Sequence, residues 1–289
     1  MPADLGALIT DVFAETSVLR AIIDPLGQAK FAQPTPAVGW SIADHVSHLA
    51  YFDELAVTSA TDADAFTALL ARVNADGGVN PDTVAAQFRQ LSGTQLREWF
   101  TRARSELLTV FAGLDPSARV PWFGPPMSVA SSLTARLMET WAHGQDIADT
   151  VGARREPTHR LRHVAHIGVG ARAFSYLAHG LQPPAEPVRV ELRAPSGELW
   201  TWGPGEAANR VTGPALDFCL LVTQRRHRDD TAVTATGATA DQWLSIAQSF
   251  AGPPGPGRRP GQFARLRADD PTAQPGGTDA DSLRRPDIA

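Results

Sequence analysis

The spacing of apolar residues changes near residue 187, and this change limits the folds open to the chain. Before it, apolar residues recur at helical spacing, which predicts helices over about 5–26, 41–58, 63–74, 82–92, 95–113, 128–151 and 158–179. After the proline-containing stretch 181–186, Val188, Val190 and Leu192 alternate with charged residues, as on a half-buried strand. We therefore predict an α+β protein with a helical domain over 1–180 and a smaller α+β domain over 187–251.

The elements expected in the second domain are short. A strand is expected over 199–202, a helix over 214–225, a strand over 231–236 and a final helix over 240–250. From Gly252 onward the chain is rich in proline, glycine, arginine and aspartate, which cannot bury a core. We expect 252–289 to be a flexible tail.

Composition narrows the class of partner. The formal net charge of -5 argues against nucleic acid or an anionic membrane surface as the main partner. The single cysteine, Cys219, excludes an intrachain disulfide, and its apolar neighbours favour a place in the core over a nucleophilic role. No apolar run reaches the ~20 residues of a membrane helix, and the first residues lack the basic start of a signal peptide. We expect a cytoplasmic protein that acts on a small molecule.

The first candidate ligands lie in the helix expected over 128–151. Glu139 and His143 are four residues apart, so they share one helix face and could bind one metal ion together. Arg136 and Asp146 continue the same stripe. The alternative is that these four residues form an ordinary solvated face, because two ligands do not make a metal site.

A third ligand has to come from another helix. The helix that begins at Ser41 offers His45 and His48, which flank its apolar side, and periodicity does not choose between them. A rival histidine group follows at spacings of four and three on one later helix, with Glu156 as the nearest carboxylate: His159, His163 and His166.

Two motifs resemble a known family. The segment 39–49, Gly-Trp-Ser-Ile-Ala-Asp-His-Val-Ser-His-Leu, resembles the opening motif of the mycothiol-dependent maleylpyruvate isomerase family, within the wider DinB-like bundles. In that family a tryptophan precedes the metal-binding histidine by eight residues. Trp40 and His48 keep this spacing, so the resemblance selects His48 over His45. The segment 136–146 is similar to the second motif, whose glutamate and histidine complete the metal set.

The resemblance implies a fold and a ligand set. The fold would be a DinB-like four-helix-type bundle followed by a small sterol-carrier-like α+β domain. The metal ligands would be His48, Glu139 and His143, with Zn²⁺ as the expected divalent ion and mycothiol as the thiol cofactor. Asp146 would bind that thiol or orient His143. The segment 223–227, Thr-Gln-Arg-Arg-His, is similar to an uncharacterised metal-binding branch of the family.

The resemblance also implies where the substrate would bind. Arg225 or Arg226 would hold substrate carboxylates, because a guanidinium suits bidentate pairing; the alternative is a solvated basic helix end. Trp122, Phe123 and Met127 would line the pocket entrance, or else pack as a loop on the bundle.

Three functions fit these observations. The first is a metal- and thiol-dependent isomerase or S-transferase that acts on a small carboxylate-bearing substrate. The second is a metal-dependent hydrolase that uses the same ligands with a bound water. The third is a non-enzymatic protein that binds a metal or small ligand, in which the protein itself would fill the fourth coordination position.

Overall fold

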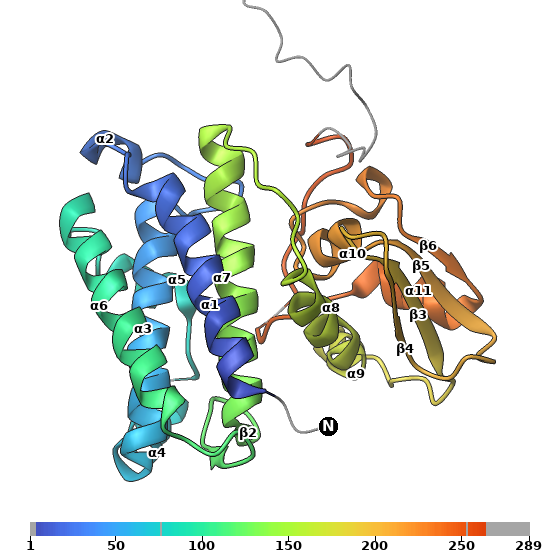
Figure 1. Cartoon of the computed structure of the whole chain (residues 1–289), viewed down its shortest axis with the longest axis horizontal. Coiled ribbons are helices and arrows are strands. Elements are labelled where there is room, and N and C mark those ends of the chain that lie inside the picture. The colour runs from blue at the N-terminus through green and yellow to red at the C-terminus, as the bar shows by residue number, and fades with distance from the viewer. Residues whose placement is uncertain (1–3, 76, 253, 264–289) are drawn as a thin grey trace, which may run out of the picture.

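The computed structural model describes residues 4–75, 77–252 and 254–263. The chain forms a helical N-terminal lobe beside a smaller lobe in which helices pack on a sheet (Figure 1). The predicted α+β class, with a helical bundle followed by a small α+β domain, is confirmed. Over the described ranges, no helix is both long enough and apolar enough to cross a membrane.

Four long helices build the N-terminal lobe, and their inner faces share cores that include Leu49, Phe100, Leu133 and Ile147. The helices of the lobe are α1 (Leu5–Ile23), α2 (Gln28–Phe31), α3 (Ile42–Thr61), α4 (Ala63–Ala75), α5 (Pro81–Ala86), α6 (Gly93–Ala112) and α7 (Val129–Val151). A two-stranded sheet of β1 (Arg119–Val120) and β2 (Met127–Ser128) precedes α7.

One buried guanidinium joins all four long helices. Arg104 of α6 donates to Asp53 of α3, with Nε 2.7 Å from Oδ2, and also to the hydroxyls of Thr16 on α1 and Thr140 on α7. Every member of this network is buried. Because breaking one partner would leave a buried charge uncompensated, the network holds α3 and α7 in one relative position. These two helices carry the candidate metal ligands.

The C-terminal lobe contains a four-stranded sheet in the order β4-β3-β5-β6. Strand β3 runs parallel to β5, with Val190 opposite Val211, and the other two pairings are antiparallel. The lobe comprises α8 (Leu161–Gly170), α9 (Arg172–Ala178), β3 (Val188–Arg193), β4 (Leu199–Trp202), β5 (Asn209–Pro214), α10 (Ala215–Val222), the 3₁₀ turn η1 (Arg228–Asp230), β6 (Thr234–Thr236) and α11 (Ala238–Ile246).

Two details of this lobe differ from the sequence prediction. The single helix expected over 158–179 is two helices, because the chain leaves the helical path at Ala171, just after Gly170. Strand β5 was not predicted, since its only fully buried side chain is Val211, and one buried position shows no alternation.

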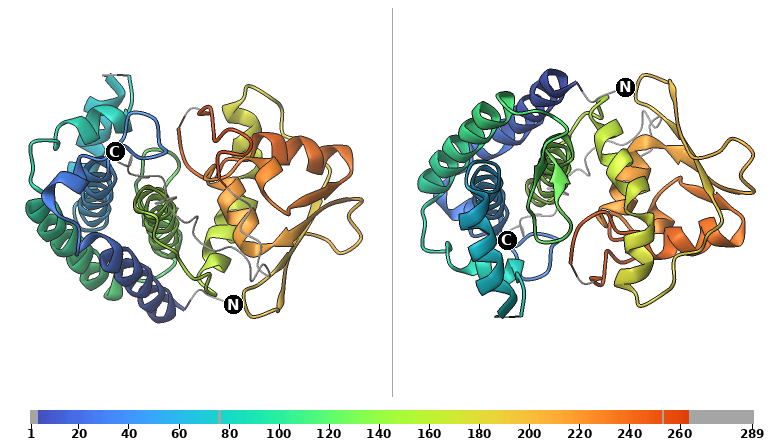
Figure 2. Two further views of the ribbon diagram at one scale, coloured as in Figure 1. Left: turned by 90° about the horizontal axis from the view of Figure 1, so that it is seen from above. Right: turned by 90° about the horizontal axis from the view of Figure 1, so that it is seen from below.

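Helix α7 lies where the two lobes meet, as all views in Figures 1 and 2 show. Helix α8 packs on both α7 and α10. A Cβ atom at Gly168 would come within 2.6 Å of Val222, so only glycine allows α8 to lie this close to α10. The predicted domain limits at 180 and 187 remain a prediction.

Part of the predicted tail lies against the protein. Arg258 reaches Asp146 on α7, and Arg226 lies over the ring of Phe263 at 4.0 Å. Residues 264–289, the larger part of the predicted tail, lie outside the described residues. The flexibility expected for 252–289 therefore stays a prediction.

Candidate metal centre

Helix α3 presents both of its histidines to the inside of the bundle. A capping box starts the helix: the Ser41 side chain accepts from the Asp44 backbone, and Asp44 accepts from the Ser41 backbone. Burial opposes the charged form of Asp44, but hydrogen bonds from Arg89 and Ser41 outweigh it and lower the pKa of this carboxyl. The start of α3 is thereby fixed, and His45 and His48 follow within its first two turns.

Helix α7 brings Glu139 and His143 to the same point. Nε2 of His143 lies 3.1 Å from Oε2 of Glu139, and Nε2 of His48 lies 3.4 Å from the same oxygen. One ligand atom from each of the three residues lies within 4.8 Å of the other two. The three ligands predicted from the sequence are therefore together in space. The alternative of a solvated face is wrong, because His143 and Asp146 are buried and only Glu139 is partly exposed.

The charges of this group suit a divalent cation. Burial, followed by the neighbouring His143, lowers the pKa of His48 to about 4, so its imidazole is neutral near pH 7. Burial works against the charged form of Glu139, but hydrogen bonds with His143 and His48 outweigh it and hold the pKa of Glu139 well below its ordinary value. Neutral imidazole and ionised carboxylate are the forms in which these residues bind metals.

Two nitrogen donors and one oxygen donor form the ligand pattern of catalytic zinc, which keeps one position open. Among the described residues, no fourth histidine, cysteine, aspartate or glutamate joins the group of His48, Glu139 and His143. The donor set therefore fits a metal ion, and metal binding by these three residues remains a prediction.

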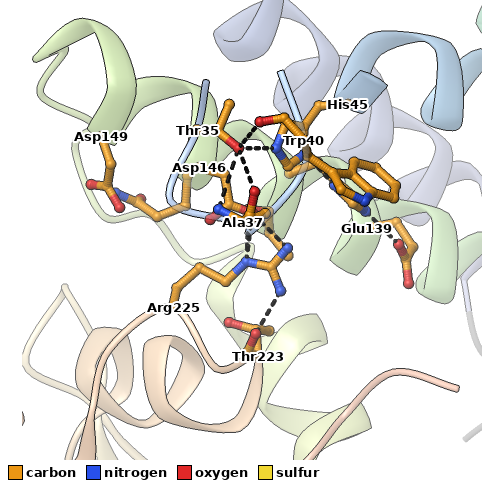
Figure 3. Close-up of polar contacts among 12 residues, drawn as sticks. Thr35, Ala37, Trp40, His45, Glu139, Asp146, Asp149, Thr223 and Arg225 are labelled. Carbon is orange, nitrogen blue, oxygen red and sulfur yellow. Dashed lines mark hydrogen bonds and ion pairs between the residues drawn. The ribbon is translucent and has the colours of Figure 1, made fainter. Parts of the chain in front are cut away.

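His45 contacts this group through the ring of His143. Its Nδ1 lies 2.7 Å from Nδ1 of His143, and its Nε2 lies 2.8 Å from Oγ1 of Thr35 (Figure 3). Burial holds the pKa of His45 well below its ordinary value, so the ring is neutral and carries one proton. If Nε2 of His45 donates to Thr35, its Nδ1 must accept from His143. With a metal ion bound, that pattern would place the proton of His143 on Nδ1 and leave the Nε2 lone pair to bind the ion.

A second group of possible ligands overlaps the first. His45, His143 and Asp146 also place one ligand atom each within 4.8 Å of the others. Asp146, however, already pairs with Arg225, at 2.8 Å, and with Arg258, at 2.5 Å. Two guanidinium groups neutralise this carboxylate, so it offers a cation far less than Glu139 does.

Trp40 covers the histidines. Its ring stacks on that of His143, with centroids 5.6 Å apart and planes inclined by 19°, and its edge or tilted contacts reach His45 and His48. Its indole Nε1 donates to Asp82 at 2.6 Å, which fixes the ring. The spacing of eight residues between Trp40 and His48 therefore places an aromatic shield over the candidate ligands.

The remaining predicted residues lie at the junction of the lobes. Arg225 donates to Asp146 and to the backbone carbonyl of Ala142, and Figure 3 shows it reaching toward α7 from the C-terminal lobe. Arg226 forms two hydrogen bonds to Asp149, of 2.7 and 2.8 Å. Both arginines already bind carboxylates of α7, and their predicted contact with substrate stays a prediction, as does thiol binding by Asp146.

Other predicted positions take ordinary places. His159 and His163 both pair with Asp11. Within the described ranges, however, the rival group of His159, His163 and His166 does not bring three ligand atoms within 4.8 Å of one another. Cys219 is fully buried, and burial raises the pKa of its thiol well above the usual range. Trp122 and Phe123 pack around Phe66 and Phe52 at one end of the bundle.

Two contributors were not singled out from the sequence. Thr35 precedes Pro36 in a loop, and Arg258 lies in a segment whose composition predicted no structure. Neither position carries a sequence signal: Thr35 contacts His45, 10 residues along the chain, and Arg258 contacts Asp146, 112 residues away.

The fold and the site together define a class: a helical bundle with a candidate His-Glu-His metal centre, joined to a small α+β domain. A family model described as the mycothiol maleylpyruvate isomerase N-terminal domain matches residues 12–148, and a model described as wyosine base formation matches 184–236. Two uncharacterised proteins from strains of Mycobacterium tuberculosis are each 48% identical over 256 residues, covering 89% of this chain and 100% of each relative.

Solved structures show the same fold. Crystal structures of the mycothiol-dependent maleylpyruvate isomerase and of one of its variants match with a TM-score of 0.54 and 18% identity, covering 81% of this chain and 93% of theirs. The chain belongs to the mycothiol maleylpyruvate isomerase family, as the two sequence motifs predicted.

Proposed function

We propose that this protein is a metal-dependent enzyme that uses mycothiol to isomerise, or to add a thiol to, a small unsaturated acid. The observation that carries the proposal is the convergence of His48, Glu139 and His143 with no fourth ligand among the described residues. Family membership supports the choice of thiol, and the related solved structures are of a mycothiol-dependent isomerase.

His48, Glu139 and His143 would hold the ion. A metal in this position would supply Lewis acidity that deprotonates a bound thiol near neutral pH. The protein's own residues keep the ligands in the required form: His45 and Thr35 orient His143, while Trp40 shields the imidazoles from water. A rigid, partly dry site of this kind favours a reactive thiolate over a hydrated one.

The proposed chemistry is an addition followed by an elimination. The thiolate sulfur would form a bond to one carbon of the conjugated double bond, and a proton would go to the other. Rotation about the resulting single bond, followed by loss of the same thiol and proton, would return the isomerised acid and the free thiol. An S-transferase would stop after the addition.

A hydrolase is less well supported by the same contacts. A hydrolase would need a free general base near the ligands. Asp146 is paired with Arg225 and Arg258, and Asp44 is paired with Arg89 at 2.8 Å. Both carboxylates are paired with guanidinium groups, so neither is placed to accept a proton from water.

The first test is the metal content of the purified protein. We expect about one equivalent of a divalent metal in the wild type, and its loss in His48→Ala and Glu139→Ala. His163→Ala is the matched control, because it removes an imidazole that also pairs with a carboxylate but lies on α8. Unchanged metal content in both ligand variants would contradict the proposal.

The second test addresses the thiol. Mycothiol at 100 times its dissociation constant should stabilise the metal-loaded protein by about 2.7 kcal/mol. For a chain of this size, that corresponds to a rise in melting temperature of roughly 5–10 °C. Desulfo-mycothiol, in which hydrogen replaces the thiol, should give a much smaller rise. Equal shifts from both compounds would argue against a metal-bound thiol.

A further inference from the structure

A buried arginine without a partner lies next to the candidate metal ligands. Arg136 is 5% exposed and lies on α7, one helical turn before Glu139. Its Nη1 atom is buried and has no hydrogen-bond partner, and no ion pair to its guanidinium is found within the described ranges. A buried guanidinium in this state is costly, because Nη1 has lost its hydration and no hydrogen bond replaces it.

The carboxylates near Arg136 already pair with other side chains. Glu139 and Asp53 are the acidic groups whose charges act on Arg136. Glu139 faces the two histidines, and Asp53 holds Arg104 at 2.7 Å. A metal ion held by Glu139 would offset the carboxylate charge that acts most strongly on Arg136, and this arginine would then be a buried cation in need of an anion.

Aromatic rings hold the guanidinium in place. Its central carbon lies 5.8 Å from the centroid of the Phe52 ring and 5.5 Å from that of Trp122. Phe52 in turn contacts the ring of His48, with centroids 4.5 Å apart. Cation–π contacts of this kind orient a guanidinium without using its N–H donors, which remain free for a ligand.

Arg136 therefore differs from the arginines at the junction of the lobes. Arg225 donates to Asp146, and Arg226 donates to Asp149. Arg136 makes no side-chain hydrogen bond within the described ranges, and Phe52 contacts both its guanidinium and the ring of His48.

We propose that Arg136 is the substrate-binding arginine of this site and that it holds a carboxylate of a small acid beside His48 and Glu139. This inference rests on the proposed function and adds the residue that recognises the substrate. The role is binding: the guanidinium would donate two N–H hydrogen bonds to one carboxylate of the substrate and thereby orient the double bond toward the thiol.

The test is anion binding, measured without turnover. The probe is maleate, a small dicarboxylate, titrated calorimetrically into the full-length, metal-loaded protein. We expect Arg136→Met and Arg136→Gln to weaken maleate binding at least tenfold while metal content stays at the wild-type level. Arg162→Met is the matched control, because Arg162 also lies over a tryptophan ring, that of Trp200, but on α8. It should bind maleate as the wild type does.

The possible outcomes separate the two proposals. Equal maleate affinity in the wild type and both Arg136 variants, or no binding to metal-loaded wild type, would overturn the role of Arg136 and leave the metal centre intact. A wild-type protein that holds no metal would instead contradict the proposed function. A parallel titration with inorganic phosphate checks the ligand class: Arg136-dependent binding of phosphate but not maleate would overturn the assignment to carboxylates.

Folding is monitored separately. A purely structural Arg136 would show a lowered melting temperature in its variants with unchanged maleate affinity in the folded fraction. If Arg136→Met does not fold, Arg136→Gln, which keeps a hydrogen-bonding end, is used for the same comparison.

Discussion

Nδ1 of His45 lies 2.7 Å from Nδ1 of His143, so one of the two histidines of α3 contacts a candidate metal ligand and does not itself face Glu139. His48, one turn further along, is the histidine of α3 that faces Glu139. The two residues thus have different roles, although their sequence environments are alike: His48 would bind the ion, and His45 would orient a ligand of that ion.

The contact between His45 and His143 leads to a prediction about metal affinity. Replacing His45 with phenylalanine removes the acceptor for the Nδ1 proton of His143 and frees that ring to rotate. Losing a partner of this kind typically costs 10- to 100-fold in metal affinity. Competition with a chelating dye would measure the loss. His166→Phe, which removes an exposed histidine of α8, is the control, and a similar affinity in the two variants would contradict the assignment.

Asp146 provides a prediction about stability. Its side chain is fully buried and binds Arg225 from the C-terminal lobe and Arg258 from the segment after it. Asp146→Asn would leave two mostly buried guanidinium groups, with side chains 12% and 9% exposed, without their anion, which should lower the free energy of unfolding by about 3–5 kcal/mol. Asp241→Asn removes a partner from an exposed pair with Arg228 and should cost less than about 1 kcal/mol. Urea unfolding would compare the two.

The same carboxylate predicts how stability depends on pH. Burial opposes ionisation of Asp146, but Arg225, His45 and Arg258 outweigh it and lower its pKa to about 2, against about 4 in the unfolded chain. The folded state therefore binds fewer protons there, and the stabilisation is complete above about pH 4 and lost as pH falls toward 2. The stability difference between wild type and Asp146→Asn should be constant from pH 6 to 5 and shrink below pH 4. A difference that stays constant down to pH 2.5 would contradict this.

The burial of Cys219 leads to a prediction about the reactivity of its thiol. It is fully buried, it donates to the Leu161 carbonyl at 3.4 Å, and burial raises the pKa of its thiol well above the usual range. A thiol reagent at pH 8 should leave the native protein unlabelled for hours and react with one equivalent in guanidinium chloride. Rapid labelling of the native protein would show that α10 opens or that Cys219 is accessible, contrary to the structure.

Local sequence signals were enough to predict most of the elements. Ser41 and Asp44 mark the start of α3, and Gly152, with φ of 70°, ends α7, because caps depend on residues within one turn. The spacing between Glu139 and His143 places both on one helix face for the same reason. Where the local signal was weak the prediction failed: α8 and α9 were expected as one helix, and β5 was not expected at all.

By itself, the sequence determined the fold class, the family and the three candidate ligands, since these depend on periodicity, on motif spacing and on residues one turn apart. Only the tertiary structure decided that His45 contacts His143, that Arg225 binds Asp146 and Arg226 binds Asp149, and that Nη1 of Arg136 is buried without a hydrogen-bond partner. These properties depend on how α3, α7 and the C-terminal lobe pack together, and packing joins residues that are 77 or more positions apart, where no local pattern in the sequence records the contact.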